Sequence, residues 1–169
     1  SDFIVTYFAS QIGVQDDTVC ITTSDPDNPT YTFRIEGETV CPPENDRETV
    51  TTNADDGVGS LRALVRNACP GDTIDFDPSL DGDSIQLDSQ IVIENNLVLL
   101  GSGKLQTIIN GNDVGRVFFT ATGTYVELHA LTITGGNSST EADTDGGGML
   151  AEGDMHLDSV AFDNNLSAD

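Results

Sequence analysis

A short helix is followed by a strand in the stretch Gly59-Ser-Leu-Arg-Ala-Leu-Val-Arg-Asn-Ala-Cys-Pro-Gly-Asp-Thr-Ile-Asp-Phe-Asp77. Ser60 is a favourable helix N-cap, and Pro70-Gly71 ends the helix. Between them, three apolar residues recur at helical spacing: Leu61, Leu64 and Val65. A short helix that precedes a series of strands suits the end of an open β-stack, which must be covered. The stretch therefore predicts the start of a solenoid, with Ser60, Leu61 and Arg62 in its structural cap.

Strand signals recur after this helix with a period of 29 residues. The period relates Leu97, Val126 and Met155, then Leu99, Leu128 and Leu157, then Leu131 with Val160 and Ile133 with Phe162. One pair of coils departs from the period, because Thr107-Ile108 matches Thr132-Ile133 at a spacing of 25. We attribute the four additional residues to a loop near Gly101-Ser-Gly-Lys104. A further strand in each coil, around Ile91, Phe119 and Met149, makes about three short strands per turn of the solenoid.

Composition favours an extracellular protein that does not bind nucleic acid. The 169 residues include 29 acidic and 6 basic side chains, for a net charge of −23, and Lys104 is the only lysine. Such a surface repels nucleic acid phosphates and anionic lipid, and it suits a calcium-rich or salty exterior. No run of about 18 apolar residues is present, so we expect no transmembrane segment. The chain begins and ends in strand-like sequence, which suggests that both termini are cuts in a larger protein.

Three cysteines, Cys20, Cys41 and Cys69, form no C-x-x-C pair, and an odd number cannot all pair within one chain. A bridge between Cys20 and Cys41 is one alternative in an oxidising compartment. Cys69 lies beside the apolar helix face, where we expect a small buried core residue rather than a reactive thiol.

The sequence before residue 45 has a different organisation. Phe3 to Tyr7, Thr18 to Thr23 and Thr30 to Glu36 are predicted strands, and Ser-Asp-Pro-Asp-Asn-Pro is a turn between the last two. Residues 18–37 resemble the closing strands of choice-of-anchor D type immunoglobulin-like domains. The resemblance implies that residues 1–40 are the C-terminal part of an incomplete β-sandwich and that residues 41–48 are a linker.

Residues 49–169 resemble the start of right-handed parallel β-helices of the pectin-lyase-like group, with a CSLREA-type N-terminal segment. Here the six-residue signature reads Gly59-Ser-Leu-Arg-Ala-Leu64, which keeps only the Ser-Leu-Arg centre. Gly146-Gly-Gly-Met149 and Phe162-Asp-Asn-Asn165 are similar to the repeats of polymorphic outer-membrane adhesins. The resemblance implies an all-β protein, a β-helix that continues beyond the chain, and a location that is secreted or on the bacterial cell surface.

Two histidines and two carboxylates share a predicted outer face. The 29-residue register places Glu127 beside His156 and His129 beside Asp158 on neighbouring strands. Such a patch could bind a transition metal or perform acid and base chemistry on a sugar. The alternative is an ordinary solvated strand face, whose outward residues are polar in any case.

Acidic clusters form a second candidate site. Asp75, Asp77, Asp81 and Asp83 surround a Pro-Ser-Leu turn, and Asp143-Thr-Asp145-Gly contains a fragment of a calcium-loop pattern. Neither cluster completes the twelve-residue EF-hand spacing. We therefore expect solvated turns and no cofactor, with calcium bound at these clusters as the alternative.

Two function classes remain open. The favoured one is a non-catalytic surface module, an adhesin-like segment or a structural stalk, whose partners are carbohydrate or a host or cell-surface protein. The other is the N-terminal portion of a polysaccharide lyase or glycoside hydrolase of the β-helix group. Lyases of that group use clustered carboxylates and an Arg or Lys base, and residues 84–169 contain only Lys104 and Arg116 as candidates.

Overall fold

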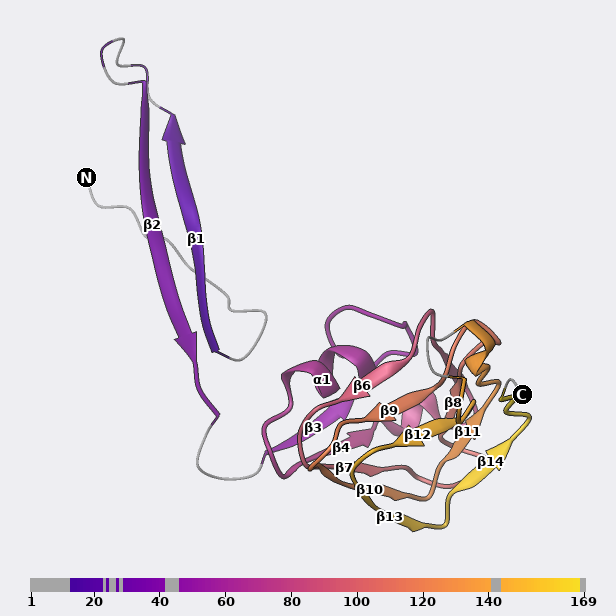
Figure 1. The fold of residues 1–169 in the computed structure, drawn as a ribbon. Helices are drawn as coiled ribbons and strands as arrows, with labels where there is room; N and C mark the ends of the chain where they lie inside the picture. The colour runs from indigo at the N-terminus through magenta and orange to yellow at the C-terminus, as the bar shows by residue number, and fades with distance from the viewer. Residues whose placement is uncertain are drawn as a thin grey trace. The chain divides into compact units, whose positions relative to one another are not determined.

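A computed structural model describes residues 13–22, 24, 27, 29–41, 46–140 and 144–167. The chain divides into two compact units, Ser1–Cys41 and Pro42–Asp169. Figure 1 shows a β-hairpin in the first unit and a stack of short strands in the second. The predicted strand Phe3 to Tyr7 and the residue Asp143 lie outside the described residues.

In the described part of the first unit, β1 (Gly13–Thr22) and β2 (Thr30–Thr39) form an antiparallel hairpin. Thr22 pairs with Thr30, so the chain reverses direction between the two strands, where the turn is predicted. β1 begins before the predicted strand and β2 ends after it, because residues 13–17 pair with residues 35–39. Whether a β-sandwich surrounds this hairpin stays a prediction.

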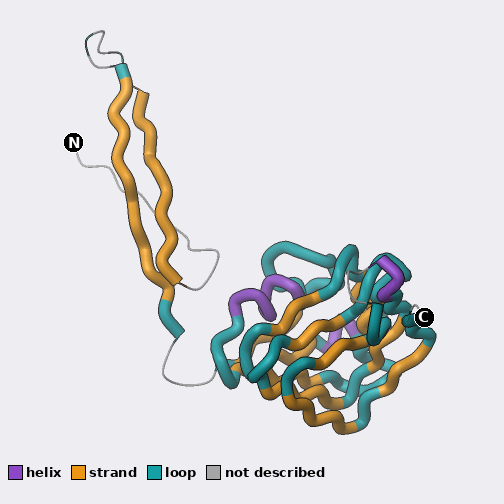
Figure 2. Tube along the Cα trace, in the orientation of Figure 1, coloured by secondary structure: helices purple, strands orange, loops and turns teal. Residues whose placement is uncertain are grey.

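The second unit is a parallel β-helix-like solenoid built from three sheets, as predicted (Figure 2). Each complete coil contributes one strand to each sheet, and each sheet is parallel throughout. The first sheet contains β3 (Arg47–Val50), β4 (Asp72–Phe76), β7 (Leu97–Leu100), β10 (Tyr125–His129) and β13 (Asp154–Asp158). The second contains β5 (Ser84–Gln86), β8 (Ile108–Asn110), β11 (Thr132–Thr134) and β14 (Ala161–Asp163). The third contains β6 (Ile91–Ile93), β9 (Phe118–Thr120) and β12 (Met149–Ala151).

Aliphatic ladders run along the inside of the solenoid. In the first sheet, Ile74, Leu99 and Leu128 stand in register and are completely buried. In the second sheet, Ile85, Ile109 and Ile133 form an equivalent ladder. Burial of such side chains contributes roughly 1.5–3 kcal/mol each. No single coil can bury these side chains alone, so stacking is what creates the core.

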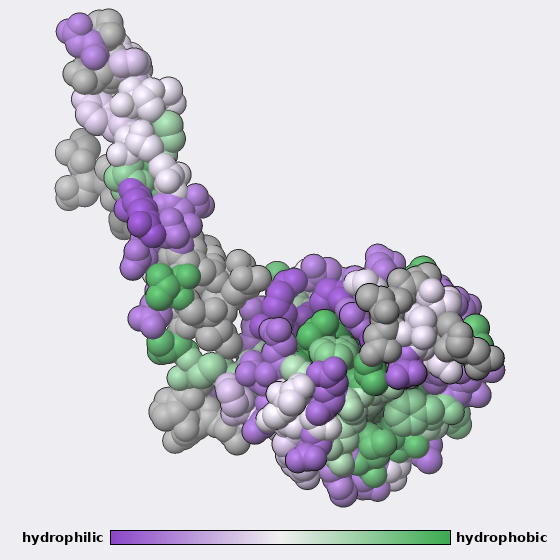
Figure 3. Space-filling model, viewed as in Figure 1, coloured by the Kyte–Doolittle hydropathy of each residue, from purple (hydrophilic) through white to green (hydrophobic). Residues whose placement is uncertain are grey.

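The last coil leaves its inward residues partly uncovered. Leu157 continues the first ladder and is 47% exposed, and Phe162 continues the second and is 48% exposed. Their partners one coil earlier, Leu128 and Ile133, are fully buried. Figure 3 shows apolar side chains exposed on the β-helix unit in this view.

The predicted 29-residue register is confirmed, except at the insertion. Val126 pairs with both Leu97 and Met155, as the period requires. In the second sheet, however, Ile133 pairs with Ile109 and not with Ile108, so the spacing is 24 and not 25. A one-residue shift reverses the faces of a strand, and burial of Ile109 decides the register. For the same reason Phe118, which is fully buried, takes the place in the third sheet that we had assigned to Phe119.

Helix α1 (Leu61–Asn67) covers the start of the third sheet. It packs against β6 at the position where a preceding strand would pair, and it also contacts β3. Three residues of the helix are buried: Leu61, Ala63 and Val65. The helix begins and ends within the predicted stretch, but β3 begins inside the segment predicted as a linker. Two short 3-10 turns complete the described structure, η1 (Pro78–Leu80) and η2 (Ser138–Thr140).

The predicted bridge between Cys20 and Cys41 is wrong. Cys41 and Cys69 are disulfide-bonded, whereas Cys20 is an exposed free cysteine in β1. Cys69 is buried as predicted, but as half of a disulfide and not as an isolated apolar thiol. The antiparallel register explains the outcome for Cys20, because it places Thr32 opposite Cys20 and leaves no cysteine within the hairpin to pair with it.

Candidate functional site

The outer face of β10 and β13 assembles the predicted group of two histidines and two carboxylates. Glu127 pairs with His156, and His129 pairs with Asp158, in the parallel register. Alternation along both strands explains the arrangement, because Val126 and Leu128 occupy the core and send the residues between and after them outward. We call Glu127, His129, His156 and Asp158 the histidine patch.

His129 is at the centre of the histidine patch. Its Nε2 lies 3.2 Å from Oε2 of Glu127, and its Nδ1 lies 3.7 Å from Oδ2 of Asp158. The rings of His129 and His156 lie with centroids 5.7 Å apart and an interplanar angle of 51°. One imidazole therefore has a carboxylate near each nitrogen and a second imidazole beside it.

The patch is open to solvent at its rim and lies beside apolar residues on one side. The His129 side chain is 21% exposed, whereas that of Asp158 is 67% exposed. On β7, Val98 and Leu100 stand in register with Glu127 and His129. Imidazoles and carboxylates can transfer protons or bind metals. Within the described residues, no three His, Cys, Asp or Glu side chains are already arranged to hold a metal ion.

Three of the four aspartates predicted around the Pro-Ser-Leu turn have carboxylate contacts within the protein. Asp75, on the outer face of β4, forms an ion pair with Arg47 at 2.6 Å. Asp77 caps η1 by accepting a hydrogen bond from the Ser79 backbone N–H at 2.8 Å. Asp81 accepts a hydrogen bond from the Ser102 hydroxyl, and Asp83 donates its backbone N–H to the Leu80 carbonyl. Calcium at this turn stays a prediction.

The Asp143-Thr-Asp145 segment is described only from residue 144 onward. The guanidinium of Arg116 donates hydrogen bonds to the backbone carbonyls of Asp145 and Gly146 and to Oε1 of Gln90. Arg116 is 3% exposed, so this cation is part of the interior beside the third sheet. Its partners indicate that it positions the backbone at residues 145 and 146.

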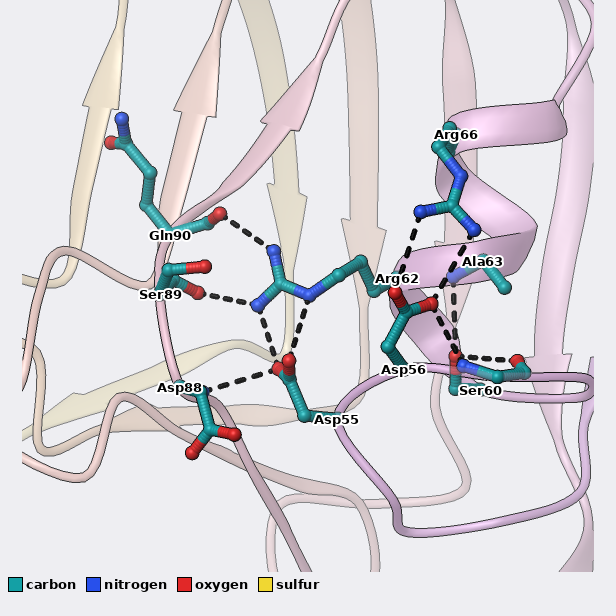
Figure 4. Close-up of polar contacts among 10 residues, drawn as sticks. Asp55, Asp56, Ser60, Arg62, Ala63, Arg66, Asp88, Ser89 and Gln90 are labelled. Carbon is teal, nitrogen blue, oxygen red and sulfur yellow. Dashed lines mark hydrogen bonds and ion pairs between the residues drawn. The ribbon is translucent and has the colours of Figure 1, made fainter. Parts of the chain in front are cut away.

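Figure 4 shows the polar contacts of Ser60 and Arg62, two residues of the predicted structural cap. The Ser60 hydroxyl accepts a hydrogen bond from the Ala63 backbone N–H, as an N-cap should. Arg62 forms an ion pair with Asp55, and its guanidinium also donates to the carbonyls of Ser89 and Gln90. Arg62 thereby ties the helix to the chain that leads into β6. Such a network is typical of a structural role.

Asp72 is a structural residue that the sequence analysis missed. It is 4% exposed, and its carboxylate accepts hydrogen bonds from the backbone N–H groups of Asp46 and Cys69. These bonds hold the backbone before β3 and beside the disulfide-bonded Cys69. The sequence feature that could have indicated this role is the position of Asp72 at the start of a strand, three residues after Cys69.

A shallow groove of about 470 Å³ lies over the second sheet. Outward residues of β8, β11 and β14 line it, together with Lys104 and Leu105 of the loop between β7 and β8. Leu105, on that loop, is 79% exposed at the groove. The remaining lining residues are Lys104, Ile108, Thr132, Thr134, Ala161 and Asp163.

No protein-family model, curated protein or solved structure matches the chain. In the part of the chain that the structure describes, no helix is long and apolar enough to cross a membrane.

Proposed function

We propose that this chain is a non-catalytic module of a secreted or cell-surface protein, an adhesin-like segment or a structural stalk. The observation that carries the proposal is the continuous in-register stack from β3 to β13, with a ladder of fully buried aliphatic residues inside it. Short strands locked in this way resist bending, because every coil contacts its neighbours over three sheets. A stack of this kind suits the projection of binding surfaces.

Two chemical features support an extracellular location. The Cys41–Cys69 disulfide is of a kind that persists in oxidising compartments and is rare in the cytosol. A net charge of −23 keeps a protein soluble where salt and calcium screen its self-repulsion. Both features are consistent with the favoured function.

The groove over the second sheet is the surface that we assign to adhesion. It combines apolar contact area at Leu105 and Ile108 with the polar groups of Lys104, Thr134 and Asp163. In repeat proteins, an insertion in one coil maps to a loop on one face, often the binding face. A carbohydrate or a cell-surface protein is the partner that we propose.

A binding assay on arrays of purified glycans and extracellular-matrix proteins tests the adhesin function. We expect retention of the labelled chain on at least one class of probe, and loss of retention in a Leu105→Glu, Thr134→Glu variant. An Asp154→Asn variant is the matched control, because Asp154 is exposed at the start of β13, on another sheet. Retention that is unchanged by the groove substitutions contradicts the assignment of adhesion to the groove. If no probe retains the chain, the structural stalk is the function that we propose.

A polysaccharide lyase is the second candidate, and the position of Lys104 in the groove favours it. Arg116, the other candidate base, is buried and bonded to backbone carbonyls. Incubation with polygalacturonate, with ultraviolet detection of unsaturated uronate products, distinguishes the two functions. Turnover that Lys104→Ala abolishes establishes the lyase, and the absence of turnover supports the non-catalytic module.

A further inference from the structure

We propose that Glu127, His129 and His156 form a binding site for a divalent transition metal of the zinc class, with Asp158 as a supporting residue. The two histidines are the only ones in the chain and lie 27 positions apart in the sequence, yet their rings are neighbours in the histidine patch. This site is independent of the proposed function, since it lies on the first sheet and not in the groove over the second.

Two of the three ligands already have the separation that a metal requires. Zinc binds imidazole nitrogen and carboxylate oxygen at about 2.0–2.2 Å in a tetrahedral arrangement, which places two ligand atoms about 3.4 Å apart. His129 Nε2 and Glu127 Oε2 are 3.2 Å apart. The pair can thus accept an ion with little movement of either side chain.

His156 is in position to supply the third ligand. It stands directly opposite Glu127 on the next strand, where strands of one sheet are about 4.8 Å apart. Its side chain is exposed and therefore free to rotate toward the ion. Among the described residues, no three His, Cys, Asp or Glu side chains are already grouped to hold a metal ion, so metal binding includes this rotation.

Asp158 supports the site from behind His129. Its Oδ2 lies 3.7 Å from His129 Nδ1, on the opposite edge of the ring from Glu127. A proton on Nε2, which faces the closer carboxylate of Glu127, has to leave or move to Nδ1 before a metal binds at Nε2. Asp158 then supports the tautomer that carries its proton on Nδ1 and leaves the Nε2 lone pair for the metal. Carboxylates in this supporting position orient the ring and raise its basicity as a ligand.

Charge and ligand type together select the class of ion. The net charge of −23 attracts cations of every kind to the surface. Two imidazole ligands, however, suit zinc, copper or nickel, whereas calcium and magnesium prefer sites made of oxygen. The patch should therefore retain zinc in the presence of excess calcium or magnesium.

Calorimetric titration of the untagged chain with Zn²⁺, in buffer that contains excess Ca²⁺ and Mg²⁺, tests the proposal. We expect one saturable site, which His129→Ala and His156→Ala each remove. Asp158→Asn should weaken binding by about tenfold or more, as loss of a supporting carboxylate does. Asp154→Asn, an exposed carboxylate on β13 that is outside the histidine patch, is the matched control and should leave the titration unchanged.

Two spectroscopic readouts separate this site from general binding to acidic residues. One equivalent of Zn²⁺ should shift the imidazole proton resonances of both histidines together, and Co²⁺ should give the intense visible bands of tetrahedral coordination. Circular dichroism of each variant verifies that the fold is intact. Absence of a saturable site, or a site that survives both histidine substitutions, overturns the proposal.

Discussion

Arg62 and Asp55 form a two-pronged ion pair, with Nε–Oδ2 and Nη2–Oδ1 distances of 3.0 and 2.6 Å. Both side chains are less than one-fifth exposed. The same guanidinium also donates to two carbonyls before β6, and the Asp88 backbone N–H donates to Asp55. This pair therefore connects the loop before α1, the helix itself and the first complete coil.

Arg62→Ala should destabilise the β-helix unit by about 2–4 kcal/mol, because it leaves a partly buried carboxylate and two carbonyls without their partner. Arg66→Ala is the control. Its pair with Asp56 is 3.4 Å long and largely exposed, so its loss should change the unfolding free energy little. Urea denaturation of the two variants gives the comparison, and equal losses would show that the Arg62 network contributes nothing beyond an ordinary surface pair.

Leu128 and Leu157 stand at the same register position on adjacent coils, but only Leu128 is fully buried. Leu128→Ala should cost about 2–5 kcal/mol in unfolding free energy, since it leaves a cavity in the ladder. Leu157→Ala should cost about 1 kcal/mol or less, because water already reaches that side chain. Equilibrium unfolding tests the pair, and similar losses would contradict the observed difference in burial.

The cysteine pairing predicts one free thiol per chain before reduction and three after denaturation in reductant. Cys41→Ser should lower the unfolding free energy of the β-helix unit by about 3–4 kcal/mol, because the disulfide closes the loop from 41 to 69, which contains β3 and α1. Thiol titration and thermal unfolding measure the two effects. Cys20→Ser serves as the control and should change the unfolding free energy little.

Asp75 should make stability depend on pH in the acid range. Burial acts to raise the pKa of its carboxyl, but hydrogen bonding to Thr49 and the Arg47 guanidinium act in the opposite sense and prevail, so the pKa lies below its ordinary value of 3.8. The ionised carboxylate therefore stabilises the fold above pH 3.8, and this contribution is lost as the pH falls through the folded-state pKa.

Comparison of the native chain with Asp75→Asn isolates this contribution. The native chain should be the more stable one between about pH 5 and 7, and the difference should shrink below about pH 4. Thermal unfolding across this range is the measurement. Asp154→Asn removes an exposed charge and controls for the general relief of self-repulsion; a difference that persists unchanged in acid would contradict the role of Asp75.

Local signals were sufficient to predict most of the solenoid. The helix was recognisable because Ser60 caps it and Pro70-Gly71 follows it, and both effects act within a few residues. The coils were recognisable because a strand alternates with period two and a stacked repeat must place similar residues in register. The histidine patch could be predicted from the same alternation and repeat spacing, since Glu127 and His129 alternate with the buried positions of β10.

Other features depend on contacts that no short stretch of sequence contains. The register of β8 was wrong by one residue, because the length of the preceding loop does not determine which of Ile108 and Ile109 faces inward. Strand β3 was missed, because its four residues become a strand only by pairing with β4. The groove over the second sheet combines residues from three coils and a loop.

The repeating architecture, the capping helix and the outward position of both histidines could be predicted from the amino-acid sequence, because periodicity and helix capping are local physical effects. The Cys41–Cys69 pairing, the partners of Arg62 and Arg116, and the close approach of the two imidazole rings were evident only in the folded structure. Each of these depends on which distant segments stacking brings together. The separation of His129 Nε2 and Glu127 Oε2, on which the proposed metal site rests, depends in addition on the side-chain conformations within one strand.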